Sequence, residues 1–362
     1  MKQKYEANMI CFIQPKLSFI SGGSLYNLEI VKRLELEGIG KNFFYPLHGS
    51  VSGLLESFSA LPSNCILVID ALYLTIPEFN ASLNEFLPYA QRTYLMLHHL
   101  ESLNTYYSTQ EKKVLWNNDA QWLRAMKGII VPSFQLRDYV LSGGIETDKI
   151  VVALPGIHRD EAYHLPNFKE RSPNEQITLI TIGTIYRRKG QLELVEMLAQ
   201  MKTKNFRLHL IGDCEQEPND TEKILALIKN AGLQDAVIVH GSVPQKTMLE
   251  LLSQSDLYIS PSTYESYSIA TAEAVVYGLP ILAYATGAIS DWIEDGVNGI
   301  VIELGKQEQF FMALRRLLTD RNELNQLRKE AFNRTVNLSF NRWDQTYQDF
   351  LKAFTQSSAV NN

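Results

Sequence analysis

Two acidic residues and a run of cations have the types and spacing to bind a ligand rich in phosphates and hydroxyls. Glu265 and Glu273 are separated by seven residues, and Arg187, Arg188 and Lys189 are adjacent. A carboxylate can accept two hydrogen bonds from neighbouring hydroxyls, which suits a sugar or a ribose. Clustered cations can neutralise a diphosphate and stabilise its departure. The structural alternatives are a solvated basic loop and, for Glu273, an exposed helical charge.

Glycines and histidines form two further candidate clusters. Gly22 and Gly23 would let the backbone approach a ligand closely, and the helix after them would offer its N–H groups to a phosphate. His98 and His99 follow an apolar run, and the spacing does not decide which of them faces inward. A plain tight turn and a structural histidine are the alternatives here.

Several other chemistries lack their residue patterns. The sequence contains no G-x-G-x-x-G, no G-x-S-x-G and no D-x-D, and its first glycine pair is not followed by G-K-[ST]. These absences disfavour a dinucleotide site, a serine hydrolase, a metal site and a P-loop. Cys11, Cys65 and Cys214 are far apart, which predicts plain core roles in a reduced intracellular protein. The net charge of −6 argues against nucleic acid as a partner.

Short continuous apolar runs alternate with longer amphipathic segments. The runs cover residues 9–13, 42–45, 65–69, 93–97, 128–131, 150–153, 177–184, 206–212, 236–241, 256–261, 280–284 and 299–303. Because they are continuous, we expect strands buried on both faces, as in parallel sheets. Helical periodicity covers residues 25–37, 191–201, 221–230, 245–253, 269–277 and 307–318. The pattern predicts an α/β protein with two doubly wound units, whose ligands bind beyond the carboxyl ends of the strands.

The length of 362 residues exceeds what one compact core usually holds, so two domains are expected. The proline-containing stretch 155–174 lacks periodicity and marks the boundary, giving domains 1–160 and 161–340. Residues 341–362 form a tail whose aromatic stripe must dock on another surface; the stripe consists of Trp343, Tyr347, Phe350 and Phe354. No apolar run is long enough to span a membrane, and residues 9–13 are too short for a signal peptide.

Taken together, these segments resemble the family-four glycosyltransferases, also called group 1 glycosyl transferases. Residues 261–287, PSTYESYSIATAEAVVYGLPILAYATG, resemble the family's central block, and the spacing of Glu265 and Glu273 matches its signature. The Lys189-Gly190 pair resembles its KG element, and residues 295–299 resemble its dG.nG turn. Residues 21–38 resemble its glycine loop and helix, and residues 131–133 its vpS element. The resemblance covers nearly the whole chain.

The resemblance implies the GT-B architecture, in which two Rossmann-like domains face a central cleft. The first domain would bind the acceptor, the second would bind the nucleotide sugar, and the tail helix would cross back to the first. The implied reaction transfers a sugar, with retention of configuration, from a UDP- or GDP-sugar to a glycan, a lipid-linked sugar or a protein. It would need no metal and no cofactor besides the nucleotide-sugar co-substrate. A cytoplasmic location is implied, while peripheral contact with the inner membrane face and the oligomeric state stay open.

The same resemblance assigns roles residue by residue. Glu265 would hold hydroxyls of the donor sugar, and Lys189 would stabilise the leaving diphosphate together with Arg188 or Arg187, between which the sequence does not decide. His98 would lie near the transferred sugar and complete the expected catalytic set. Glu273 would bind the ribose of the nucleotide. The other expected donor-binding residues are Gly22, Gly23, Gly183, Thr184, Arg187, Val243 near the base, Tyr264, Ser266, Tyr267, Ser268 and Ile269.

Two departures from the family pattern keep other functions open. Thr184 stands where many members have arginine, and Ser266 and Ser268 replace glycines. A catalytically silent partner subunit is therefore one alternative, and a nucleotide-sugar epimerase or sugar phosphorylase on the same fold is another. Acceptor contacts are expected from the first domain, in residues 47–57 and 100–116.

Overall fold

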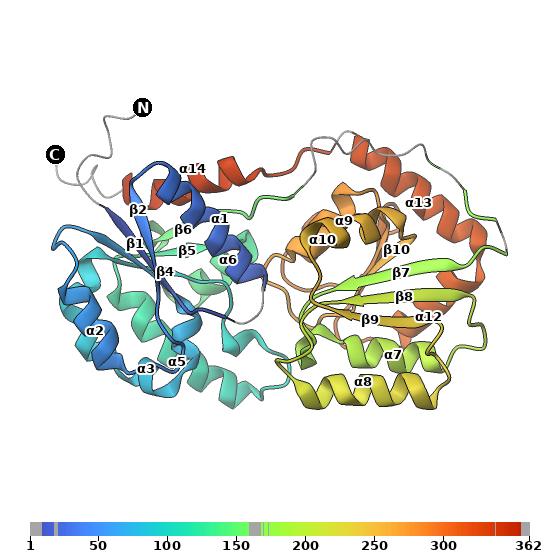
Figure 1. The fold of residues 1–362 in the computed structure, drawn as a ribbon, viewed down its shortest axis with the longest axis horizontal. Helices are drawn as coiled ribbons and strands as arrows, with labels where there is room; N and C mark the ends of the chain where they lie inside the picture. Colours follow the sequence, from blue (N-terminus) through green and yellow to red (C-terminus); the bar gives the residue numbers. More distant parts are fainter. Residues whose placement is uncertain are drawn as a thin grey trace. The chain divides into compact units, whose positions relative to one another are not determined.

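The computed structural model describes residues 9–17, 21–158, 168, 170–172, 174–336 and 338–355. The chain divides into two compact units, both drawn in Figure 1. The first contains residues 9–17, 22–156 and 341–355 of the described chain, and the second contains residues 21 and 157–340 where they are described. Each unit is a parallel sheet with helices on both faces (Figure 1).

The first unit is built on six parallel strands in the order β2-β1-β3-β4-β5-β6. Their bounds are β1 Ile10–Gln14, β2 Gly40–Phe44, β3 Ile66–Asp70, β4 Thr93–Met96, β5 Gly128–Val131 and β6 Ile150–Val152. The four central strands are almost entirely buried. Continuous apolar sequence produces this burial because both faces of a parallel sheet are covered.

Helices cover the first sheet unequally. Side chains from α2 to α6 join one large apolar cluster with the sheet, whereas α1 and the last helix, α14, lie on its opposite face (Figure 1). α5 begins with a capping box in which Ser108 and Glu111 satisfy each other's backbone N–H groups. The bounds are α1 Gly22–Leu36, α2 Val51–Ser59, α3 Pro77–Ala81, α4 Leu83–Phe86, α5 Thr109–Ala125, α6 Phe134–Ser142 and α14 Trp343–Thr355.

The aromatic stripe of α14 packs inside the first unit. The Phe350 ring stacks on that of Phe12 in β1, with 6.3 Å between centroids. Trp343 meets the edge of Tyr26 in α1 at 5.9 Å. Because Phe12 and Phe350 are both fully buried, α14 forms part of the core of a unit that is otherwise built from residues up to 156.

The second unit repeats this plan with the order β12-β11-β10-β7-β8-β9. Its strands are β7 Ile177–Ile182, β8 Phe206–Ile211, β9 Val237–Gly241, β10 Leu257–Ser260, β11 Ile281–Tyr284 and β12 Gly299–Ile302. α7, α8 and α12 pack on one face and α9, α10 and α11 on the other. The helices are α7 Gln191–Ala199, α8 Pro218–Asn230, α9 Gln245–Gln254, α10 Ile269–Val276, α11 Ile289–Trp292, α12 Gln307–Thr319 and α13 Arg321–Val336.

The predicted α/β class with two doubly wound sheets is confirmed. Each apolar run forms a strand whose ends differ from the prediction by at most two residues. One correction concerns the glycine pair, because α1 begins at Gly22 and not at residue 25. Gly22 and Gly23 therefore form the first helical turn, which the apolar pattern missed because glycine has no side chain to contribute to it.

Both sheets reverse their strand order at one point. In the first sheet the reversal lies between β1 and β3, and in the second it lies between β7 and β10. Ligands of open parallel sheets bind outside the carboxyl ends of the strands at such switch points. The residues that follow these four strands are therefore the first places to look for a site.

We expect Phe350→Ala to lower the free energy of unfolding of the first unit by about 3–5 kcal/mol, since it leaves a cavity between α14 and β1. Urea titration followed by tryptophan fluorescence measures this change. Gln348→Ala, at an exposed position of the same helix, serves as the control and should change stability by less than about 0.5 kcal/mol. A similar small change for Phe350→Ala would show that α14 contributes no core.

Candidate functional site

The second unit gathers charged residues at its switch point. Residues 183–190 follow β7 and residues 261–268 follow β10, and these two strands are hydrogen-bonded neighbours. Parallel strands bring their carboxyl ends to the same edge of a sheet. The cationic run and the first glutamate of the sequence motif therefore meet, although 76 residues separate Lys189 from Glu265.

Lys189 and Glu265 form a close ion pair at this edge. The Lys189 Nζ atom donates to Glu265 Oε1 over 2.6 Å, and the two side chains are only 18% and 9% exposed. Burial alone would raise the pKa of Glu265, but the charges of Lys189 and Arg188 hold that pKa below its usual range. The carboxylate is thus ionised, and the pair leaves two ammonium protons of Lys189 for other acceptors.

The local backbone brings Lys189 to this position. Arg187–Lys189 form one 3₁₀ turn, which ends at Gly190 in the left-handed region with φ 70°. A Cβ atom on Gly190 would clash with the carbonyl oxygen of Pro261, so only glycine allows the two loops to approach this closely. The N–H of Thr263 also donates to the Arg188 carbonyl over 2.8 Å.

The three cations of the run have different surroundings. The Arg188 guanidinium donates from Nη1 to the carbonyl of Tyr264 over 3.1 Å, which fastens it to the loop that carries Glu265. Arg187 is exposed. The sequence does not decide which of the two arginines accompanies Lys189, and the structure holds Arg188 beside the ion pair.

Glu273 is buried in α10 with only 2% of its surface exposed. Its Oε1 atom has no hydrogen-bond partner among the described residues, and burial raises its pKa to about 8. The alternative of an exposed helical charge is therefore wrong. A buried carboxyl oxygen without a partner is costly for a fold, and a ligand hydroxyl would satisfy it.

Ser268 precedes α10, and its backbone has a conformation that residues other than glycine rarely adopt. Its φ is 64°, the one positive value that a non-glycine residue shows in the described part of the chain. Its hydroxyl makes no capping bond to the helix backbone and instead shares a hydrogen bond of 2.7 Å with Thr271 Oγ1. Ordinary helix capping therefore does not explain Ser268, whose backbone lies in the left-handed region that glycine adopts most easily.

Gln191 is a residue that the sequence did not single out. From the start of α7 its Nε2 donates to the carbonyls of Gly183 and Thr184 at 3.0 and 3.1 Å. These bonds fix the turn between β7 and the cationic run. Gln191 is 4% exposed and its Oε1 has no partner among the described residues. In the sequence, its position directly after the Lys189-Gly190 pair is the one feature that points to such a role.

Most of the remaining predicted donor-binding residues belong to residues 261–268 or to the start of α10, whereas Val243 follows β9. The Tyr264 hydroxyl and Ser266 Oγ are 3.2 Å apart. Tyr267 is buried with its ring edge against Trp292 at 5.6 Å, and Ile269, the first residue of α10, is also buried. Val243 is half-buried against the apolar cluster that contains α10.

Gly22, Gly23 and His98 belong to the first unit, so the structure gathers the predicted residues into two separate groups. A Cβ atom on Gly23 would lie 3.0 Å from the His98 ring, which shows that the imidazole lies directly on the first turn of α1. His98 Nε2 is 2.7 Å from Asn27 Oδ1. His99 instead approaches Glu101, with 3.5 Å between Nε2 and Oε1.

Other parts of the described chain show little that suggests chemistry. No group of three or more potential metal ligands occurs among the described residues, and none of the helices described there is long and apolar enough to cross a membrane. Cys11 and Cys65 are fully buried and Cys214 is half-buried.

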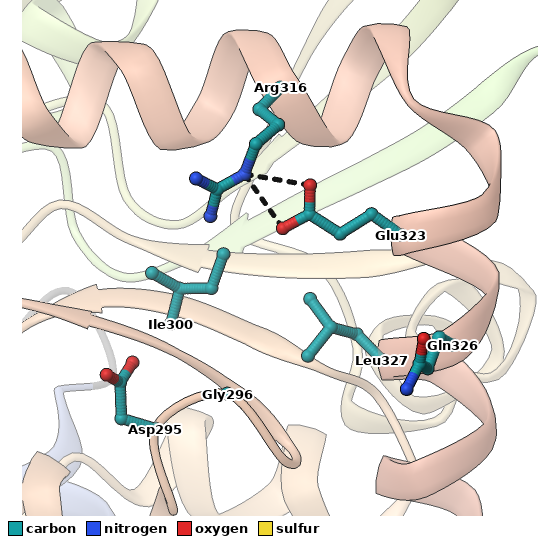
Figure 2. Close-up of a pocket in the computed structure, with 7 residues that line it drawn as sticks. All are labelled: Asp295, Gly296, Ile300, Arg316, Glu323, Gln326 and Leu327. Atoms are coloured by element: carbon teal, nitrogen blue, oxygen red, sulfur yellow. Dashed lines mark hydrogen bonds and ion pairs between the residues drawn. The ribbon is translucent and has the colours of Figure 1, made fainter.

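A polar pocket of about 280 Å³ lies at the other edge of the second sheet, near the amino end of β12 (Figure 2). It contains none of the predicted site residues, and an ion pair of 2.8 Å between Arg316 and Glu323 joins its walls. The neighbouring dG.nG turn is structural. Asp295 Oδ1 accepts from Val301 N over 2.9 Å, and Asn298 Nδ2 donates to Trp292 O over 2.9 Å.

Comparisons with known sequences identify relatives of this chain. The family model described as "Glycosyl transferases group 1" matches residues 166–334. A D-inositol 3-phosphate glycosyltransferase of Xylanimonas cellulosilytica is 26% identical over 62% of this chain and 55% of its own length. The lipopolysaccharide glucosyltransferase WaaG of Escherichia coli K12 is 29% identical over 54% of each chain. The chain thus spans about half the length of the curated relatives it matches.

Solved structures share the whole fold. A sucrose-phosphate synthase from Thermosynechococcus elongatus superposes with a TM-score of 0.75 over 98% of this chain and 100% of its own, at 17% identity. HepE from Anabaena, solved in complex with UDP and glucose, gives a TM-score of 0.70 over 96% and 99%, also at 17% identity. At these identities the likeness shows the fold, which is the predicted GT-B architecture.

We expect Lys189→Met and Glu265→Gln each to destabilise the second unit, because each leaves a partner of a buried ion pair without its counter-charge. The cost should approach about 3–5 kcal/mol per single variant. The double variant should be less destabilised than the sum of the two, with a coupling of about 1–3 kcal/mol. Urea unfolding of the four proteins measures the cycle, and additive effects would mean that the pair contributes nothing to the site's rigidity.

Proposed function

We propose that this chain, of which residues 166–334 match the family model of the group 1 glycosyl transferases, transfers a sugar from a nucleotide-diphosphate sugar to a hydroxyl-bearing acceptor. The observation that carries the proposal is the arrangement at the switch point of the second sheet. There a buried Lys189–Glu265 pair lies on the loops beside α10, which holds the unpartnered carboxyl oxygen of Glu273. Cations for phosphates and carboxyls for hydroxyls are what a nucleotide-sugar donor requires.

Each group of the site then has a role in holding the donor. Glu273 would bind the ribose hydroxyls, and Glu265 would accept from hydroxyls of the sugar. The two remaining ammonium protons of Lys189 would reach the diphosphate, with Arg188 adding positive charge nearby. The backbone N–H groups between Ser266 and Ile269, which open α10, would complete the phosphate contacts.

The proposed reaction breaks the bond between the sugar's anomeric carbon and the β-phosphate oxygen. The electron pair of this bond leaves with the nucleoside diphosphate, where Lys189 and Arg188 stabilise the new charge. The acceptor oxygen bonds to the same face of the anomeric carbon, and its proton passes to the departing phosphate. Retention of configuration and a reaction without a metal are parts of this proposal that follow from the family resemblance.

UDP-glucose is the first donor to test. HepE, which shares the fold, was solved with UDP and glucose and with UDP-glucose, and WaaG is named a glucosyltransferase. Donor binding without turnover over a broad acceptor panel would favour the silent-subunit alternative, which Thr184 motivates. A new nucleotide sugar formed without acceptor would favour the epimerase alternative, and a sugar phosphate would favour the phosphorylase.

We predict that UDP-glucose or another nucleotide sugar, at about 100 times its dissociation constant and with chelator present, stabilises the protein by about 2.7 kcal/mol. Thermal unfolding measures the shift. In the same assay Lys189→Ala should bind the donor more weakly and turn it over on the order of 10²–10³ times more slowly. Lys202→Ala, at an exposed position outside the site, is the matched control. Full turnover in Lys189→Ala would refute its role.

We also predict that donor affinity rises with pH between about 6.5 and 8.5. The pKa of Glu273 is raised to about 8 by burial, so below this pH its proton must leave before the carboxylate can accept two ribose hydroxyls. Affinity should increase by at most about tenfold per pH unit and level off above the pKa. Calorimetric titration with UDP-glucose measures the profile. Glu273→Gln should bind weakly and show no such slope, and a flat wild-type profile would contradict the ribose role.

A further inference from the structure

Gln191 is a buried polar side chain to which the proposed transfer assigns no role. The other buried residues of α7 are apolar, namely Leu194, Val195, Met197 and Leu198. Gln191 occupies the first position of this helix and is 4% exposed. Its Oε1 has no hydrogen-bond partner among the described residues, so the fold leaves one of its two polar groups unsatisfied at a cost in stability. Packing alone does not account for a polar side chain here.

The Nε2 atom of Gln191 holds two consecutive carbonyl groups. It donates to the oxygen of Gly183 over 3.0 Å and to that of Thr184 over 3.1 Å. Gly183 directly follows β7, and Gln191 directly follows Gly190, so the two bonds reach from the end of the cationic loop back to its beginning. The side chain therefore closes the loop of residues 183–190 and fixes the two peptide groups whose carbonyls it binds.

These bonds determine where the N–H of Thr184 points. A peptide group is planar and trans, so its carbonyl and its N–H point in opposite directions. The carbonyl of Gly183 is turned toward Gln191. The Thr184 N–H belongs to the same peptide and is therefore turned away from Gln191. No hydrogen bond joins this N–H to another described residue.

The flanking N–H groups show which side the Thr184 N–H faces. The N–H groups of Gly183 and Ile185 donate, each over 2.8 Å, to the carbonyls of Ile211 and Asp213. These two acceptors lie at the end of β8 and in the loop after it. Alternate residues of an extended strand direct their N–H groups to the same neighbour. The Thr184 N–H, between them, therefore faces the other neighbour of β7, which is β10.

This side of β7 carries the ion pair of the proposed donor site. Glu265 lies in the loop that follows β10. The Lys189 ammonium lies beside the same peptide group, because a Cβ atom on Gly183 would be 3.7 Å from its Nζ. A phosphate held by Lys189 would therefore also meet the Thr184 N–H. A hydrogen bond from a backbone N–H to such an anion is roughly twice as strong as one between neutral groups.

We propose that Gln191 is a positioning residue, which orients the peptide between Gly183 and Thr184 so that the Thr184 N–H donates to the diphosphate of the donor. This inference rests on the proposed glycosyl transfer for the identity of the ligand. The orientation of the peptide does not, because it follows from contacts inside the second unit. The backbone would then supply a phosphate contact at position 184, where many family members have arginine.

One NMR signal reports this contact directly. Gly183-Thr184 is the one Gly-Thr pair in the sequence. Protein that contains glycine labelled with carbon-13 at its carbonyl and threonine labelled with nitrogen-15 therefore gives a single peak when each carbonyl is correlated with the next amide. Saturation with UDP, or with GDP if UDP does not bind, should move the Thr184 amide proton downfield, because a phosphate oxygen accepts from it. A nucleotide complex, shown by calorimetry, in which this signal does not move would overturn the inference.

Gln191→Met nearly keeps the size of the side chain and removes both of its hydrogen bonds. The Thr184 signal should differ from that of the wild type in the free protein, and its response to the nucleotide should be lost. Calorimetry should show nucleotide binding weakened by about 10- to 100-fold, the loss expected for one hydrogen bond to a charged group. Gln200→Met, at an exposed position directly after the same helix, is the matched control and should bind as the wild type does.

The outcomes separate this inference from the proposed function. If Gln191 only stabilises the fold, Gln191→Met will lower the unfolding temperature, bind the nucleotide with wild-type affinity and show the wild-type shift at Thr184. That result would overturn the inference and leave the proposed function in place. A wild-type protein that binds neither UDP, GDP nor any nucleotide sugar would remove the proposed function and the phosphate contact with it. If Gln191→Met does not fold, the wild-type titration still decides.

Discussion

The ion pair between Lys189 and Glu265 depends on several features of the second unit. A buried pair is tolerable only when its geometry is close and its charges are compensated, since desolvation of two ions costs several kcal/mol each. The contact of 2.6 Å is possible because β7 and β10 are neighbours in the sheet. The 3₁₀ turn that carries Lys189 ends at a glycine in the left-handed region. Arg188 donates a hydrogen bond to the loop that carries Glu265. Contacts that hold two charges in place before a ligand binds are the preorganisation that the proposed charged donor would need.

The two units share one topological feature, the reversal of strand order, but the side chains found there differ in chemistry. In each sheet, polar side chains collect where the strand order reverses, and they are held by contacts that reach across neighbouring loops. The second unit presents cations together with a carboxyl oxygen that has no partner among the described residues. The first presents a chain of hydrogen bonds that runs from Asp70 through Asn27 to the neutral imidazole of His98. Cations suit the phosphates of a ligand, and a neutral imidazole suits an uncharged hydroxyl.

Particular residues show what the sequence could and could not predict. Continuous apolar runs predict the strands. Lys189 and Glu265 are predicted to lie near the ligand because they follow strands, and ligands of open parallel sheets bind beyond the carboxyl ends of the strands. The burial of Glu273 was not readable, because an acidic residue between alanines fits an exposed helix equally well. The contacts of Asn27 and Gln191 are not predictable from sequence, because a polar residue near the start of a helix is ordinary and only the distances reveal its partners. The pattern also predicts a loop at Gly22 and Gly23, because glycine contributes no side chain to helical periodicity.

Hydrogen exchange of the backbone amides with and without a saturating nucleotide sugar tests most directly whether the second sheet's switch point is the donor site. We expect UDP-glucose, or whichever nucleotide sugar binds, to slow exchange in residues 183–190 and 261–273. Protection confined to residues 295–327, around the polar pocket, would contradict this assignment. So would binding that leaves both of the predicted loops unprotected.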